Sequence, residues 1–107
     1  MYSKFGQFID GKWQASSNKE TYDVINPATE EVIGKASKAS STDVEKALKS
    51  AEGGFKIWKK FLPWDRALII RKIADNIRKK NNELAKWMTL ETGKPLAESL
   101  AEVGASA

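Results

Sequence analysis

The stretch TYDVINPATEEVIG, residues 21–34, predicts two extended segments joined by a turn. Residues 21–25 are rich in β-branched and aromatic side chains, which favour a strand. Asn26 and Pro27 begin a group of residues that is typical of a turn. Residues 32–34 then resume an extended path, so we expect β-structure with a tight connection here.

A hairpin is predicted upstream of this stretch. Residues 5–9 lead into Asp10-Gly11, a dipeptide that favours a tight hairpin turn, and Lys12-Trp13 begins the return strand. A polar loop at residues 16–19 separates the hairpin from the strand at residues 21–25. Residues 1–40 are therefore expected to form a region of one β-hairpin and short strands.

From residue 41 onward the apolar residues recur with the period of a helix. Thr42 and Glu45 have the spacing of a capping box, which predicts a helix start there. An apolar stripe follows, formed by Val44, Ala47, Leu48, Ala51, Phe55 and Trp58. Gly53-Gly54 weakens this helix by about 1 kcal/mol per glycine relative to alanine, so we expect a close packing neighbour at that pair.

A second helix is predicted around Pro63, which either ends the first helix or opens the second. Ile69, Ile70, Ile73 and Ile77 share one face of this second helix. Leu68 lies on its polar side and Arg66 on its apolar side, a pattern that makes sense if both faces meet protein.

Two more helices complete the predicted order. Asn81-Asn82 is expected to cap the third helix, Gly93 to end it, and Pro95 to lie in the first turn of the fourth. In the fourth helix Leu96, Leu100, Val103 and Ala107 recur at helical spacing up to the last residue. Because no glycine, proline or basic turn ends this stripe, we expect the chain to stop inside a helix. Residues 41–107 are thus interpreted as the helical region of the same incomplete domain.

The composition excludes several kinds of site. The chain has 107 residues, and it contains no cysteine and no histidine. A disulfide partner, a thiolate nucleophile, an imidazole base and a Cys/His zinc site are therefore excluded. The lack of cysteine suits a reducing cytoplasm, and no apolar run is long enough for a signal peptide or a membrane span.

The charges and short motifs point to no ligand. There are 18 Lys and Arg against 14 Asp and Glu, but they are interspersed on helix faces, so no nucleic-acid partner is expected. Neither of the common phosphate-binding glycine motifs is present. The adjacent Glu30 and Glu31 point apart and are not expected to act together. The four tryptophans are expected in a core or an interface rather than in a stacking site, namely Trp13, Trp58, Trp64 and Trp87.

Glu91 is the carboxylate that requires an explanation. It lies on the same predicted helix face as Leu84 and Met88, so we expect a carboxylate aimed at the core. A buried carboxylate is costly unless it is paired, hydrogen-bonded or bound to a cation. Two partners remain open: the N-terminus of the following helix near Lys94-Pro95, or a bound monovalent cation.

Taken in order, these stretches resemble the aldehyde dehydrogenase family. FIDGKW at residues 8–13 resembles the first hairpin of the family. VINPAT at 24–29 and EVIG at 31–34 are similar to its N-P-A-T-G-E-V-I-G signature, with Glu30 where glycine is usual. Residues 43–58, residues 66–77 and LETGKPLAE at 90–98 continue the match. The resemblance implies an α/β fragment like the start of the family's cofactor-binding domain, closest to the succinate-semialdehyde dehydrogenase branch.

The same resemblance implies an NAD(P)-dependent enzyme of several hundred residues that oxidises an aldehyde to a carboxylic acid. The family's cysteine nucleophile, glutamate base and nucleotide-binding residues lie downstream of the matched segment. No catalytic or cofactor-binding residue is therefore assigned, and neither NAD nor NADP is expected to bind this chain alone. The resemblance also implies a structural cation site, formed by Glu91 and the backbone carbonyls of Val24 and Ile25.

Two functions follow as hypotheses. The chain is either the N-terminal part of an aldehyde dehydrogenase, inactive alone, or a non-catalytic oligomerisation or interaction module derived from that family. Both imply a second copy or a full-length relative as the partner, with no membrane involved. A basic nucleic-acid binder is a third reading that the interspersed charges do not favour.

Overall fold

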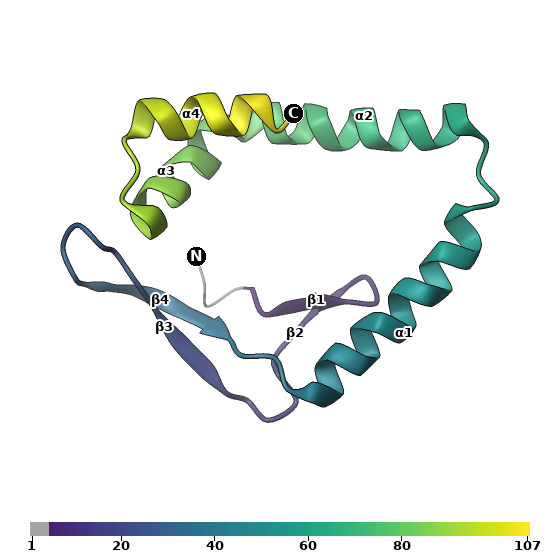
Figure 1. The fold of residues 1–107 in the computed structure, drawn as a ribbon, viewed down its shortest axis with the longest axis horizontal. Coiled ribbons are helices and arrows are strands. Elements are labelled where there is room, and N and C mark those ends of the chain that lie inside the picture. The colour runs from purple at the N-terminus through teal and green to yellow at the C-terminus, as the bar shows by residue number, and fades with distance from the viewer. Residues whose placement is uncertain (1–4) are drawn as a thin grey trace. The chain divides into compact units, whose positions relative to one another are not determined.

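A computed structural model describes residues 5–107, which form four strands and four helices (Figure 1). In chain order these are β1 (Gln7–Ile9), β2 (Lys12–Gln14), β3 (Thr21–Ile25), β4 (Val32–Ser37), α1 (Ser41–Trp58), α2 (Pro63–Lys79), α3 (Asn81–Thr92) and α4 (Leu96–Ala105). The predicted order of a hairpin, short strands and then helices is confirmed.

The elements divide into two compact units. Unit 1 comprises Met1–Ile25 and Val32–Lys60, and its described part contains the four strands and α1. Unit 2 comprises Asn26–Glu31 and Phe61–Ala107, and it contains the turn between β3 and β4 together with the other three helices. The regions expected at residues 1–40 and 41–107, and their assignment to one domain, stay a prediction.

The hairpin of unit 1 forms as its turn dipeptide predicts. β1 and β2 pair antiparallel, with Phe8 opposite Trp13. Asp10 and Gly11 have φ angles of 54° and 73°, the left-handed values that a two-residue hairpin turn requires. The rings of Phe5 and Phe8 pack against Trp13, with centroids 4.9 and 5.1 Å away.

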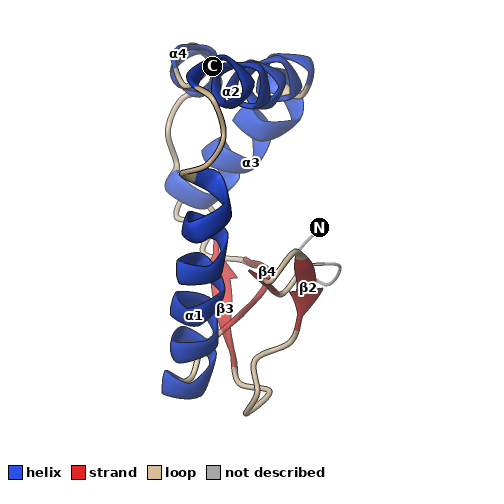
Figure 2. Cartoon of the chain, turned by 90° about the vertical axis from the view of Figure 1, so that its right-hand side faces the viewer, coloured by secondary structure: helices blue, strands red, loops and turns tan. Residues whose placement is uncertain are grey.

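The second strand pair of unit 1 joins β3 to β4, which are drawn in red in Figure 2. The two strands are antiparallel, with a register shift between Val24 and Ile25. The turn that follows is closed by Asn26, whose backbone N–H donates to the carbonyl of Glu31 at 2.9 Å. Glu30 has a φ of 61°, a left-handed conformation that glycine adopts without strain. The residue that departs from the family's glycine therefore keeps the backbone that glycine favours.

Helix α1 begins at Ser41, as expected, but its capping box is not the predicted one. The side chain of Ser40 accepts from the amide of Asp43 at 3.2 Å, and the carboxylate of Asp43 accepts from the amide of Ser40 at 3.0 Å. The assignment to Thr42 and Glu45 is wrong. Both pairs have suitable spacing, and Ser40 with Asp43 prevails because Asp43 gains further donors from residues outside the helix.

The boundaries of α2 and α3 are partly as predicted. Pro63 opens α2 after Leu62, which resolves the two readings of that proline. The prediction that Asn81-Asn82 caps α3 is wrong, because Lys80 occupies the cap and no side chain bonds there. Lys80 also caps the C-terminus of α2, so this single residue separates the two helices. Gly93 ends α3 with a φ of 73°, which confirms its predicted role.

The start of α4 differs from expectation. Pro95 is the cap before Leu96 and does not lie within the first turn. The helix stops at Ala105, and Ser106 caps it by donating its backbone N–H to the carbonyl of Glu102 at 3.0 Å. The hydroxyl of Ser106 donates to the same carbonyl at 2.9 Å. The bond from the Ser106 amide is an ordinary i to i−4 helical bond, and Ser106 keeps right-handed helical dihedral angles, so the expectation for the end of this stripe stays a prediction.

Few apolar side chains are buried in the described chain. The buried apolar residues are Ile9, Ala85 and Val103, and the buried polar residues are Ser16, Asp43 and Ser99. Most of the predicted α1 stripe is exposed, as are Trp13 and Trp64, so those two tryptophans do not lie in a core. Outside the helix's own backbone, no atom of residues 5–107 lies within 4 Å of a side chain built at Gly53 or Gly54, so the described residues do not supply the close packing neighbour expected there. Among residues 5–107, no helix combines the length and the apolar character needed to cross a membrane.

Candidate functional site

The most connected polar site of unit 1 surrounds Asp43, which is 4% exposed. Its carboxylate accepts hydrogen bonds from the backbone N–H of Ser17 at 3.1 Å and the hydroxyl of Ser16 at 3.0 Å. The backbone N–H and hydroxyl of Ser40 donate to it at 3.0 and 2.9 Å, and the Gln7 amide lies at 3.5 Å. We call these residues the Asp43 cluster. It ties the loop after β2 to the start of α1.

The Asp43 cluster holds its carboxylate in the ionised form. The hydrogen bond from the backbone of Ser40 lowers the pKa of Asp43 well below its ordinary value of 3.8. Burial acts in the opposite direction, but the bonds from Ser17, Ser16 and the Ser40 hydroxyl add to the lowering. The ionised carboxylate thus serves as the common acceptor for donors of the loop after β2 and of the start of α1.

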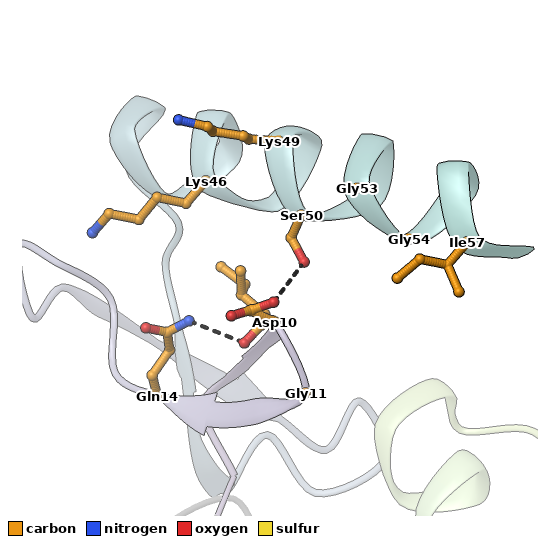
Figure 3. A pocket seen from close by; sticks show the side chains of 10 residues that line it. Asp10, Gly11, Gln14, Lys46, Lys49, Ser50, Gly53, Gly54 and Ile57 are labelled. Atoms are coloured by element: carbon orange, nitrogen blue, oxygen red, sulfur yellow. Dashed lines mark hydrogen bonds between the residues drawn. The ribbon is translucent and has the colours of Figure 1, made fainter.

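An open groove of about 790 Å³ lies between the β1–β2 hairpin and α1 in unit 1 (Figure 3). The Ser50 hydroxyl donates to the Asp10 carboxylate at 3.4 Å, and the Gln14 amide donates to the Ile9 carbonyl at 3.5 Å. The side chains of Lys46 and Lys49 extend away from Asp10 in Figure 3. At 3.4 Å the contact between the Ser50 hydroxyl and the Asp10 carboxylate is longer than the bond that activates a serine nucleophile, so it assigns no catalytic role to the groove.

The chain has no G-x-G-x-x-G sequence of the kind that binds a nicotinamide dinucleotide. Dinucleotide-binding folds hold the pyrophosphate on a glycine-rich turn between a strand and a helix. Gly53 and Gly54, the adjacent glycines of the chain, lie inside α1 and far from its start at Ser41. No residue among 5–107 is therefore assigned to cofactor binding.

The best-defined site of unit 2 joins the end of α3 to α4. The hydroxyls of Thr89 and Ser99 lie 2.9 Å apart, and Ser99 is fully buried. Lys94 pairs with Glu102, and that hydrogen bond raises the pKa of the Lys94 amino group above 10.5. Between the two helices, Gly93 lies so close to Pro27 that an added Cβ would be 3.0 Å from the proline ring. The turn at Asn26–Glu31 thus packs against the end of α3.

Glu91 lies near the end of α3 in unit 2, and its side chain is exposed. The expectation of a buried carboxylate is wrong for this chain, because α3 does not have enough covering protein on that face. Val24 and Ile25 lie in β3 of unit 1, at the register shift of the strand pair. Among residues 5–107, no group of three or more acidic, histidine or cysteine side chains could hold a metal ion. The cation site with Glu91 stays a prediction.

Sequence reasoning missed Asp43 and Ser99. The Ser40-x-x-Asp43 spacing is visible in the sequence and was the available signal for Asp43. Its further partners, Ser16 and Ser17, lie 27 and 26 residues away in the chain, and no local pattern connects them. Ser99 carries no sequence signal, because its partner Thr89 lies in a different helix.

Comparison with known proteins decides the family. Residues 13–107 match the model of the family described as "Aldehyde dehydrogenase family". This match covers most of the chain. The chain belongs to the aldehyde dehydrogenase family. The resemblance stated from the sequence is therefore confirmed.

Relatives in the family agree in sequence and in fold. The chain is 40% identical over 96 residues to succinate-semialdehyde dehydrogenase [NADP(+)] 2 of Schizosaccharomyces pombe, covering 90% of this chain and 20% of that protein. A betaine aldehyde dehydrogenase structure from Staphylococcus aureus in complex with NAD+ has a TM-score of 0.88 at 40% identity, covering 92% and 20%. A 3,6-anhydro-L-galactose dehydrogenase in complex with NAP has a TM-score of 0.91 at 34% identity, covering 95% and 21%.

The length of these relatives limits what the match means. The chain spans about a fifth of each of them, and its fold matches the start of an aldehyde dehydrogenase structure. The two relatives at 40% identity act on different aldehydes according to their names, so identity alone does not select a substrate branch.

Proposed function

We propose that this chain is the N-terminal part of an NAD(P)-dependent aldehyde dehydrogenase, which oxidises an aldehyde to a carboxylic acid. The proposal is carried by the family match over residues 13–107 together with 40% identity to enzymes about five times longer. The chain contributes scaffold and no chemistry, because it has no cysteine to attack an aldehyde and no phosphate-binding turn. A cytoplasmic location belongs to the same proposal, since a chain without cysteine needs no oxidising compartment.

The surface of the chain supports this proposal. Its accessible area is 8243 Å². Two separate compact domains, each with half the mass of the chain, would together expose only about 7200 Å². The accessible area of the chain exceeds this value, and the comparison already assumes that the two units bury no surface against each other. Much of that surface is apolar, including Leu48, Phe55 and Leu62. Apolar patches of this extent usually mark surfaces that other protein covers.

Two assays test the proposal. The purified chain, mixed with NAD or NADP and a panel of aldehydes, is expected to form no reduced cofactor above the uncatalysed rate. A chimera in which this chain replaces the matching first fifth of the S. aureus betaine aldehyde dehydrogenase is expected to oxidise betaine aldehyde with NAD. Turnover by the chain alone would contradict the first expectation, and a folded but inactive chimera would contradict the second.

The alternative is a non-catalytic oligomerisation or interaction module derived from the same family. The exposed apolar residues of α1 and α2 favour it, because a stand-alone chain would need a partner for them. Size-exclusion chromatography with light scattering separates the two readings. A single discrete oligomer of the chain favours the module, and a monomer or a broad aggregate favours the enzyme segment.

The cation site is a further part of the proposal. A carboxylate and two backbone carbonyls are the hard oxygen ligands that alkali and alkaline-earth cations prefer. The register shift between Val24 and Ile25 interrupts the strand ladder where those carbonyls are expected to bind. Sodium or potassium chloride is expected to raise the melting temperature of the chimera relative to tetramethylammonium chloride at equal ionic strength. Glu91→Gln should remove that difference, and an unchanged difference would exclude Glu91 as a ligand.

A further inference from the structure

The turn between β1 and β2 joins an aspartate directly to a glycine. Asp10 and Gly11 are both exposed, and both have a left-handed backbone. Of the aspartates in the chain, only Asp10 is followed by glycine, whereas the others precede valine, arginine or asparagine. The carboxyl carbon of an aspartate can form a five-membered ring with the backbone nitrogen of the next residue. The turn therefore brings a carboxyl group beside a backbone nitrogen that carries little steric protection.

The backbone nitrogen of Gly11 is accessible. Among residues 5–107, no backbone carbonyl accepts a hydrogen bond from its N–H. A Cβ built at Gly11 would meet no atom within 4 Å, so the space beside the nitrogen is open. Glycine itself has no Cβ that would crowd a ring at this position. Neither a hydrogen bond to the backbone nor a neighbouring side chain thus hinders ring closure at Gly11.

The carboxylate of Asp10 is only weakly held in place. Its hydrogen bond from the Ser50 hydroxyl measures 3.4 Å, which is longer than an ordinary O–H···O bond (Figure 3). The Asp43 carboxylate, by contrast, accepts the amides of Ser17 and Ser40 at 3.1 and 3.0 Å. The Asp10 carboxyl group can therefore turn toward the Gly11 nitrogen without breaking a strong contact.

We propose that the β1–β2 turn is a modification site at which Asp10 converts spontaneously to an isoaspartyl residue. The Gly11 nitrogen bonds to Cγ of Asp10, and a carboxyl oxygen leaves as water with the amide proton. Water then adds to the α-carbonyl carbon of the ring, and the bond from that carbon to the Gly11 nitrogen breaks. The mass is unchanged, but the backbone now runs through Cγ and the α-carboxylate becomes the side chain. Methyltransferases that transfer a methyl group from S-adenosylmethionine to isoaspartyl carboxylates take this class of substrate.

The conversion changes the hairpin, because it adds one carbon atom to the backbone of the turn. Ile9 pairs with Lys12 across two residues, a spacing that matches the left-handed turn. A longer turn no longer matches this register, so the packing of Phe8 against Trp13 should loosen. We expect the amides of β1 and β2 to exchange hydrogen faster in the converted chain than in fresh protein. Unchanged exchange would overturn this consequence.

Peptide mapping of aged protein tests the site. The purified chain is kept at neutral pH for several weeks, in parallel with a sample in denaturing urea. Trypsin releases Asp10 within residues 5–12 and Asp23 within residues 20–35, and electron-transfer fragmentation identifies isoaspartate in each peptide. In the folded chain we expect at least about tenfold more isoaspartate at Asp10 than at Asp23, because Gly11 lacks the β-branched side chain of Val24.

Asp23 is the matched internal control. It is exposed like Asp10, but it lies in the β3–β4 ladder and pairs with Lys35 at 2.6 Å. Asp10→Glu keeps the charge but requires a six-membered ring, and it should strongly reduce labelling of the aged chain by an isoaspartyl methyltransferase. Asp10→Asn keeps the ring size and should convert faster with loss of ammonia, since an amide is attacked more readily than a carboxylate. Circular dichroism confirms that both variants fold.

Each outcome decides for or against the site. An isoaspartyl fraction at Asp10 no higher than that at Asp23 overturns the proposal. Conversion in urea but not in the folded chain would mean that the turn protects Asp10, and it overturns the proposal as well. Unchanged methyl labelling in Asp10→Glu would locate the reactive residue elsewhere. The result does not depend on the proposed function, because the reaction needs only the turn itself and water.

Discussion

Asp43→Ala is expected to lower the melting temperature of the chain by roughly 10 °C. The substitution removes the acceptor of the Ser17 and Ser40 amides and of the Ser16 hydroxyl. Donors left without a partner in a buried site are costly, and the cap of α1 is lost at the same time. Thermal unfolding followed by far-ultraviolet circular dichroism measures the change.

Glu45→Ala is the matched control for this prediction. Glu45 is an exposed carboxylate in the first turns of the same helix, and it belonged to the capping box that the sequence favoured. Its loss should shift the melting temperature by only a few degrees. Hydrogen exchange gives a second readout, because the Ser17 amide should exchange faster in Asp43→Ala alone. Equal effects of the two substitutions would mean that charge at the helix start, and not the Asp43 cluster, stabilises unit 1.

The Asp43 cluster also predicts how stability depends on pH. The pKa of Asp43 lies below its ordinary value of 3.8 in the folded chain, so the folded state binds fewer protons than the unfolded state. The contribution of the cluster is therefore complete well above pH 3.8 and is lost as the pH falls below that value. Asp43→Asn removes the ionisable group, so the stability of this variant should fall less steeply as the pH is lowered. If stability falls equally steeply with decreasing pH in Asp43→Asn, the loss at low pH arises from other carboxylates.

Gly93→Ala is expected to destabilise the chain by about 2 kcal/mol, measured by urea unfolding. Gly93 has a φ of 73°, where a side chain is strained, and its Cβ would lie 3.0 Å from the ring of Pro27. The substitution therefore strains the end of α3 and also displaces the turn at Asn26–Glu31. Hydrogen exchange at that turn should increase as well.

Gly53→Ala is the control that should change stability in the opposite direction. Gly53 lies inside α1 with no atom within 4 Å of an added Cβ, so alanine should stabilise the chain by about 1 kcal/mol. If both substitutions destabilise the chain, the space beside Gly53 is occupied in solution. The same substitution can be made in the covalent chimera. There, a loss of stability in Gly53→Ala would indicate that the rest of the enzyme packs against that glycine.

Much of the local structure was predictable because it depends on a few adjacent residues. Asp10 and Gly11 adopt the left-handed conformation that a two-residue hairpin needs, Pro63 opens α2, and Gly93 closes α3. The errors lie at helix ends where two neighbouring groups of residues could each act as the cap. Lys80 displaced Asn81 at the start of α3 because it already ends α2.

The candidate site was less predictable, since its contacts join distant residues. The expectation for Glu91 used helical periodicity, which identifies a face but not what covers that face. Glu91 is exposed because the described chain does not cover that side of α3. The apolar stripe of α1 shows the same limit of helical periodicity. Its pattern correctly predicts a helix, but Leu48 and Phe55 on that stripe are exposed because no described residue covers them.

The sequence by itself determined the family, the order of the elements and the absence of thiol and imidazole chemistry, because motifs, turn residues and composition are local properties. Only the tertiary structure decided which carboxylate is buried, since Asp43 draws its donors from a loop 26 residues away. It alone placed Pro27 against Gly93, and it alone left both faces of α2 exposed. Burial depends on which segments meet in space, and a pattern along one helix cannot specify its neighbours.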